Sequence, residues 1–178
     1  MFSSARRANS AQRAIASALL VAAAVAALLN LSGCGSRQPL VDNLLEGMKE
    51  QEVMQAMHSS PGKFRVVAET GLVKNDPRPP YSVKVIRAEG VLCAGQLSDI
   101  SLSFYLKQLH VVSCYPKDVD AMIEALLKAG YITTRGREFD VLLDGVAVSS
   151  TEIDGRWCVS FSSKRLTDDQ RRWNLRYS

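Results

Sequence analysis

Residues 100–115 read ISLSFYLKQLHVVSCY, and this stretch decides the class of fold. From Ile100 to Leu106, apolar side chains stand at every second position, with serine or tyrosine between them. A period of two is typical of a β-strand with one buried face. Lys107-Gln108 predicts a tight turn, after which residues 109–115 run back beside the first strand. The sequence therefore predicts an antiparallel hairpin.

The segment that follows the hairpin changes to helical spacing. Asp118 predicts an N-cap, and Gly130 predicts the end of the helix. The apolar side chains between them recur every three or four residues, as in a helix with one buried face. We expect this helix to cover the sheet. The predicted core consists of Met122, Ile123, Leu126 and Leu127 on the helix and Leu102, Phe104, Leu109, Val111, Trp157 and Phe161 on the sheet.

Further helices and strands are predicted before and after the hairpin and its helix. Asp144-Gly145 and Asp154-Gly155 are typical of hairpin turns. Thr167-Asp168-Asp169 predicts the cap of a final short helix. The pattern predicts an α+β fold, an antiparallel sheet covered on one face by helices. Because helix-then-strands order occurs twice, two degenerate α-β repeats are an alternative description of the same fold. The other predicted elements are a helix over 49–58 and strands over 64–68, 82–88, 91–93, 138–143, 146–153 and 156–162.

The N-terminus has the three parts of an export signal. Arginines and no acidic residues precede an apolar run over 14–29, and small residues then lead to Cys34. Leu31-Ser32-Gly33-Cys34 resembles the lipobox of bacterial lipoproteins. The resemblance implies cleavage after residue 33 and attachment of acyl chains such as palmitate to Cys34. Gly35, which is not aspartate, implies delivery to the outer membrane. The alternative of an uncleaved anchor helix is weaker, because such a helix needs about 20 apolar residues.

The resulting organisation is a signal peptide over 1–33, a lipidated tether over 34–39 and a single periplasmic domain over 40–178. The chain has 22 basic and 18 acidic residues, and three of the arginines lie in the signal. The processed chain therefore carries a net charge of only +1, so the sequence predicts no nucleic-acid partner.

Three cysteines remain after Cys34 is acylated, and they allow one disulfide. We expect Cys93 to bond to Cys114, which leaves Cys158 free. If both bonded cysteines sit on strands either side of a central strand, they are about 10 Å apart, too far to bond. A loop position for Cys93 removes that obstacle, and a Cys114–Cys158 bond is the alternative. No spacing typical of a metal site is present, and we expect no metal or cofactor.

One segment near the start of the domain resembles a known family. Leu44-Leu45-Glu46-Gly47-Met48, Glu52-Val53 and Pro61 are similar to the opening of the SmpA/OmlA proteins, small outer-membrane lipoproteins of the barrel-assembly machinery. The resemblance implies a β-lactamase-inhibitor-like fold. It also implies a role in outer-membrane assembly or integrity through contacts with other envelope proteins. A periplasmic inhibitor or ligand-binding module of the same fold is the alternative function.

No pattern typical of a catalytic site is present, so we expect a non-enzymatic protein. His110 is expected to be a surface or hydrogen-bonded histidine, and Cys158 a partly buried strand residue. The candidates for partner binding lie in the C-terminal tail, because Arg, Trp and Tyr are common at the centres of interfaces. The alternative is a frayed, solvated terminus. These candidates are Arg171, Arg172, Trp173, Arg176 and Tyr177.

Overall fold

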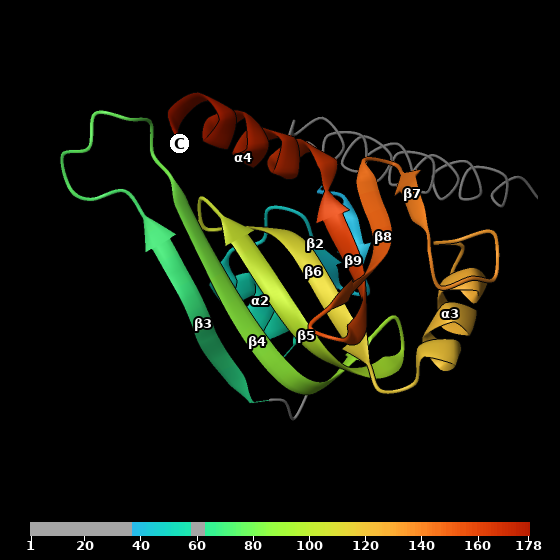
Figure 1. Ribbon diagram of the computed structural model, residues 1–178. Coiled ribbons are helices and arrows are strands. Elements are labelled where there is room, and N and C mark those ends of the chain that lie inside the picture. The colour runs from blue at the N-terminus through green and yellow to red at the C-terminus, as the bar shows by residue number, and fades with distance from the viewer. Residues whose placement is uncertain (1–36, 58–62) are drawn as a thin grey trace, which may run out of the picture. The chain divides into compact units, whose positions relative to one another are not determined.

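A computed structural model describes residues 37–57 and 63–178. Seven strands form one antiparallel sheet in the order β3-β4-β5-β6-β9-β8-β7, and a small two-stranded sheet pairs β1 with β2 (Figure 1). The α+β class and the antiparallel sheet predicted from the sequence are therefore confirmed. The strands are β1 (Pro39–Val41), β2 (Leu44–Leu45), β3 (Phe64–Gly71), β4 (Ser82–Cys93), β5 (Gln96–Tyr105), β6 (Gln108–Pro116), β7 (Asp140–Leu143), β8 (Val146–Ile153) and β9 (Arg156–Ser163).

Two meanders make up the large sheet, β3 to β6 and β7 to β9, and the pairing of β6 with β9 joins them. The predicted hairpin is present as β5 and β6. Its turn, however, is Leu106-Lys107 rather than Lys107-Gln108, because Tyr105 pairs with Gln108. Both turn residues have positive φ, 50° and 63°. Neither is a residue that favours this conformation, so the sequence gives no local signal for the turn.

The described residues form three helices: α2 (Glu50–Ala56), α3 (Val119–Lys128) and α4 (Lys164–Tyr177). The helix predicted after the hairpin is confirmed as α3. Asp118 caps it by accepting a hydrogen bond from the Ala121 N–H at 2.9 Å. Gly130, with φ of 78°, follows its end. Met122 and Leu126 are completely buried, as the helical spacing predicts.

The core lies on one face of the sheet. A cross-strand row of apolar side chains runs through five neighbouring strands and contacts the buried residues of α2 and α3. Val111 was predicted for this core, and that prediction is wrong. A bulge between β5 and β6 leaves His110 unpaired, so Val112 points to the core and Val111 to the other face. The core row is Ile86, Leu102, Val112, Phe161 and Val148.

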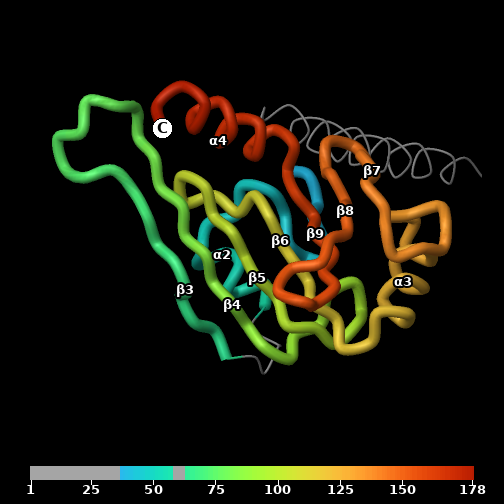
Figure 2. The backbone as a smooth tube through the Cα atoms, in the orientation of Figure 1, coloured from blue at the N-terminus to red at the C-terminus, as the bar shows by residue number. Residues whose placement is uncertain are grey.

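The C-terminal helix is longer than the sequence indicates. The prediction that it is short and capped at Thr167-Asp168-Asp169 is wrong. Ser163, the last residue of β9, caps it by accepting a hydrogen bond from the Leu166 N–H at 3.2 Å. The tail is therefore an ordered helix and not a frayed terminus. Figure 2 shows the long loop that connects β3 to β4, and this loop lies beside the C-terminal end of α4.

The strand predicted in two pieces over 82–93 is one strand, β4, with a bulge near Gly90. Gly90 adopts a φ of 69°, which glycine accommodates without strain. A bulge bends its strand, and the tip of the β4–β5 hairpin reaches Asp42, whose carboxylate accepts the Ala94 N–H at 2.9 Å.

The bend explains how two cysteines on either side of a central strand meet. Cys93 and Cys114 are joined at disulfide distance, with Cα atoms 6.4 Å apart instead of about 10 Å. Cys93 is the last residue of β4 and not a loop residue. Cys158 is free and buried.

The described part of the chain begins at Arg37, within the predicted tether over 34–39. Arg37 pairs with Glu52 of α2 at 3.1 Å, and Pro39 already belongs to β1. The predicted signal, Cys34 and Pro61 lie outside the described residues. Within the described ranges, no helix is both long and apolar enough to cross a membrane.

Candidate functional site

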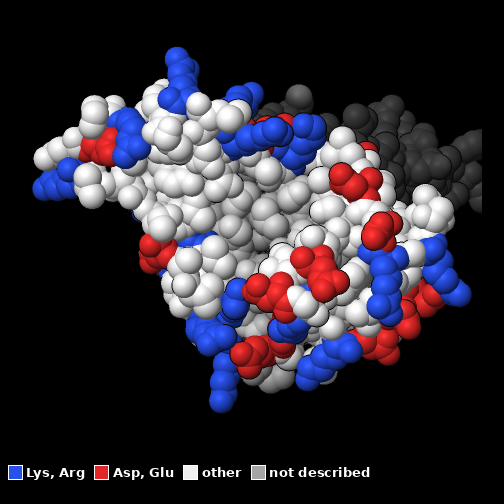
Figure 3. Space-filling model, in the orientation of Figure 1, with Lys and Arg blue, Asp and Glu red and all other residues white. Residues whose placement is uncertain are grey.

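The face of the sheet opposite the core is open over most of its width. Ser101, Ser113, Ser160 and Ser149 pair directly with one another across β5, β6, β9 and β8. All four are partly exposed. Four small side chains in one row leave the surface hollow, and Figure 3 shows a hollowed middle that carries no charged side chain. We call this row and its neighbours Ser103 and Ser162 the serine face.

Hydrogen bonds within the serine face are few. The hydroxyls of Ser113 and Ser160 lie 2.8 Å apart and share one hydrogen bond. The neighbouring row alternates Ser103, Val111, Ser162 and Ala147. Hydroxyl groups on this face therefore have free donor and acceptor capacity beside small apolar patches.

The serine row continues into two arginines on the outer strands. Ser101 pairs with Arg87 on β4, and Arg87 pairs with Arg65 on β3. Like charges directly opposite on neighbouring strands destabilise a sheet. Arg65 pairs with Glu89 at 3.8 Å, whereas Arg87 makes no ion pair within the described part of the chain. The Arg87 guanidinium is thus available to a partner.

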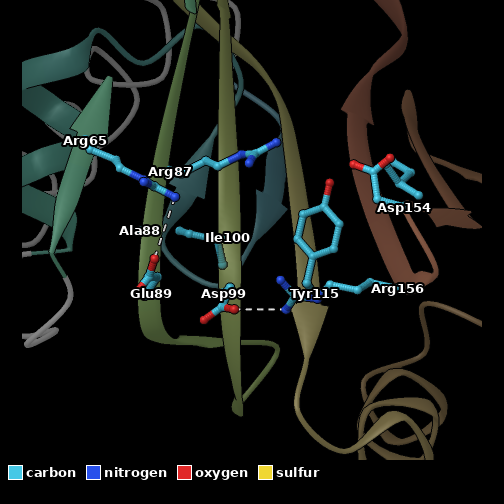
Figure 4. Close-up of a pocket in the computed structure, with 10 residues that line it drawn as sticks. Arg65, Arg87, Ala88, Glu89, Asp99, Ile100, Tyr115, Asp154 and Arg156 are labelled. Carbon is cyan, nitrogen blue, oxygen red and sulfur yellow. Dashed lines mark hydrogen bonds and ion pairs between the residues drawn. The ribbon is translucent and has the colours of Figure 1, made fainter. Parts of the chain in front are cut away.

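A pocket of about 100 Å³ adjoins these arginines. Arg156, from the start of β9, donates a hydrogen bond to Asp99 at 2.9 Å and lies 5.1 Å from the centre of the Tyr115 ring. Figure 4 shows Arg87 extending across β5 on the side of Tyr115, and Arg65 directed at Glu89. Asp154 lines the opposite wall. The pocket therefore presents both signs of charge at one end of the serine face.

The protonation states do not favour nucleophilic chemistry here. Burial raises the pKa of the Tyr115 hydroxyl, so it stays protonated at neutral pH. Burial also raises the pKa of the Cys158 thiol, which contacts the Ser160 hydroxyl at 3.6 Å. A protonated, buried thiol is a poor nucleophile. In the ranges that the structure describes, no group of three potential ligands could hold a metal ion.

At the end of the sheet away from the pocket, His110 of β6 contacts α4. This histidine is 3% exposed. Its Nδ1 lies 2.9 Å from the Ser103 carbonyl oxygen, to which it donates, and its Nε2 lies 3.0 Å from the Gln170 side chain. Burial lowers the pKa of His110. His110 is therefore hydrogen-bonded on both ring nitrogens, which agrees with the second of the two expectations from the sequence.

The predicted partner-binding residues divide into two groups on α4. Trp173 packs on Tyr81 with ring centres 4.2 Å apart and donates to the Pro79 carbonyl at 3.2 Å. The backbone carbonyl of Tyr177 accepts a hydrogen bond from Arg78 at 3.0 Å. The two aromatic residues thus attach α4 to the loop before β4. The three residues that are exposed are Arg171, Arg172 and Arg176.

The serine row and its arginines were not predicted as a site. The sequence does show alternate serines in β5 and β9, but it does not give the register that brings four serines and two arginines into one row. The structure defines an α+β protein with one open sheet face. A comparison of the chain with protein-family models and with curated proteins gives no match.

Proposed function

We propose that the chain is a non-enzymatic bacterial lipoprotein that binds other proteins of the cell envelope through its serine face. The observation that carries this proposal is the open row from Arg65 and Arg87 to Ser149, which presents hydroxyl groups beside a guanidinium, that of Arg87, without an ion pair among the described residues. Interfaces combine a centre that is poor in charged residues with a polar, solvent-accessible rim. Arg87 and the polar pocket supply that rim.

The second part of the proposal is the location of the protein. Cleavage after residue 33 and acylation of Cys34 would anchor the domain at the periplasmic face of the outer membrane. More than one acyl chain makes such anchoring stable. Support comes from the lipobox-like residues and from Gly35. A role in outer-membrane assembly or integrity follows from the SmpA/OmlA resemblance and is proposed with it.

Two finer features of the fold belong to the same proposal. One is a helical layer on the core face of the sheet, to which α2 and α3 contribute buried residues. The other is a pair of degenerate repeats, in which a helix precedes a meander twice, α2 before β3–β6 and α3 before β7–β9. By motif the SmpA/OmlA resemblance covers only the start of the first of these units, and by element order it extends over the whole domain.

Site-specific photo-crosslinking in living cells tests the binding surface. A photoreactive residue at Ser113, in the middle of the serine face, should give one discrete crosslinked product with an envelope protein. The same residue at Glu124, on the exposed side of α3, is the matched control and should give none. Ser160→Arg fills the hollow beside Ser113 and should remove the product.

The identity of the captured protein separates the two candidate functions. A membrane or barrel-assembly protein agrees with the proposal. Capture of a soluble periplasmic enzyme would instead favour the alternative, in which the serine face binds and inhibits that enzyme. Equal crosslinking from Ser113 and Glu124 would show that the serine face is not the binding surface.

The anchor has an independent test. Metabolic labelling with a palmitate analogue should mark the wild-type chain, and Cys34→Ala should abolish the label. A label that persists in the Cys34→Ala variant contradicts acylation at this residue.

A further inference from the structure

The outward side of α4 concentrates positive charge. The helix contains five basic and two acidic residues, although the processed chain as a whole is almost neutral. Leu166, Gln170 and Trp173 turn toward the protein, so the basic side chains lie on the opposite side. Figure 3 shows Lys and Arg side chains along this helix. The cationic face of α4 comprises Lys164, Arg165, Arg171, Arg172, Leu175 and Arg176, all exposed.

Two of these arginines have no acidic partner. Arg172 pairs with Asp169, and Lys164 pairs with Asp168 at 2.6 Å. Within the described ranges Arg171 and Arg176 form no ion pair with an acidic side chain. Among them stands Leu175, which is 79% exposed. Arginines without acidic partners attract an anionic lipid surface, and an exposed leucine between them can bury apolar area at the boundary between headgroups and acyl chains.

The point where the chain enters the domain lies next to this helix. The Gln38 carbonyl accepts a hydrogen bond from the Glu46 N–H at 2.8 Å. The Glu46 carboxylate in turn accepts from Arg165, in the first turn of α4, at 3.4 Å. Gln38 follows Cys34 by four residues, which reach at most about 14 Å when fully extended. An acylated Cys34 would therefore hold the first turn of α4 close to the bilayer.

We propose that the cationic face of α4 lies on the anionic headgroups of the membrane that holds the lipid anchor. This inference rests on the proposed acylation of Cys34. The contact fixes the orientation of the domain. The β8–β9 turn, which lines the polar pocket, is separated from α4 by the length of β9, about 26 Å, and points away from the membrane.

The test uses the full-length protein, purified from membranes and reconstituted into vesicles, with Leu175→Cys carrying an environment-sensitive dye. Cys158 is buried and Cys93 is bonded to Cys114, so the new thiol is the one that reacts. In vesicles with one phosphatidylglycerol in three lipids at about 0.1 M salt, the dye should fluoresce about twofold more strongly than in phosphatidylcholine vesicles. About 0.5 M salt should remove the difference.

Three controls make the result specific. A dye at Ile153→Cys, next to the β8–β9 turn, should not respond to lipid composition. Arg171→Glu with Arg176→Glu should abolish the response at Leu175→Cys. Lys117→Glu with Lys128→Glu makes the same change in net charge at two exposed positions, one just before α3 and one at its end. This double variant should leave the dye response at Leu175→Cys intact.

Failure of the inference and failure of the anchor give different results. Flotation with phosphatidylcholine vesicles reports the acyl chains alone, and its loss overturns the anchor. Flotation without a salt-sensitive response at Leu175→Cys overturns the membrane contact of α4. An equal response at Leu175→Cys and Ile153→Cys also overturns the membrane contact of α4.

Discussion

Ser163 connects three parts of the molecule through one hydroxyl. It is completely buried, accepts the Leu166 N–H as the cap of α4, and donates to the Glu46 carboxylate. Ser163→Ala removes the cap, which contributes about 1 kcal/mol, and a hydrogen bond to a charged group, which contributes about 1.5–3 kcal/mol. We expect urea unfolding to show a loss of about 2–4 kcal/mol. Ser162→Ala, one residue earlier and partly exposed, should cost less than about 1 kcal/mol. Equal losses would contradict this account of Ser163.

His110 makes the stability of the domain depend on pH. Because burial lowers its pKa in the folded state, the unfolded chain binds a proton more readily. The contribution of His110 to the free energy of unfolding should therefore be constant well above the unfolded pKa of about 6.5, and should decrease as the pH falls from there toward the lower folded pKa. Urea unfolding of wild type and His110→Gln at several pH values between 7.5 and 5.5 measures this contribution, because the two proteins share every other titrating group. If the difference in stability between the two does not change with pH, His110 does not titrate in this way.

At the scale of elements, α3 provides the clearest test of packing. Leu126 is completely buried against the sheet, whereas Glu124 points outward and pairs with Arg135. Leu126→Ala should lower the free energy of unfolding by about 2–5 kcal/mol. Glu124→Ala removes an exposed ion pair and should cost less than about 1 kcal/mol. Thermal unfolding of the two variants beside wild type checks this, and indistinguishable midpoints would contradict the packing of α3 on the sheet.

Elements with a strong periodic signal could be predicted from the sequence. The period of two in β5 and the helical spacing of α3 each define one buried face, and Asp144-Gly145 and Asp154-Gly155 adopt the positive φ values that hairpin turns need. The exceptions have local physical causes. The bulge at His110 exchanges the faces of Val111 and Val112, and alternation alone contains no sign of an added residue. The start of α4 was missed because Ser163 ends a strand and caps a helix at once.

The serine face depends on information that no single strand carries. Ser101, Ser113 and Ser160 each stand between two apolar residues, which indicates only a solvent-facing position. β6 and β9 are separated by 39 intervening residues, and their pairing aligns Ser113 with Ser160 and thereby joins the two meanders into one open face. Long-range register of this kind is determined by the packing of the whole core. A candidate site built across such a register can be described only once the sheet is known.

The state of the four cysteines tests the covalent structure of the whole molecule. The lipobox resemblance predicts acylation of Cys34, and the structure has a bond between Cys93 and Cys114 and a free Cys158. Protein purified from membranes should therefore expose no reactive thiol when native, because Cys158 is buried. It should expose one when unfolded without a reductant and three when unfolded with one. Two thiols in the unfolded, unreduced protein would show that Cys34 is not acylated, and three would show that the disulfide is absent. A peptide map that joins Cys114 to Cys158 would contradict the bend of β4 that brings Cys93 across the central strand.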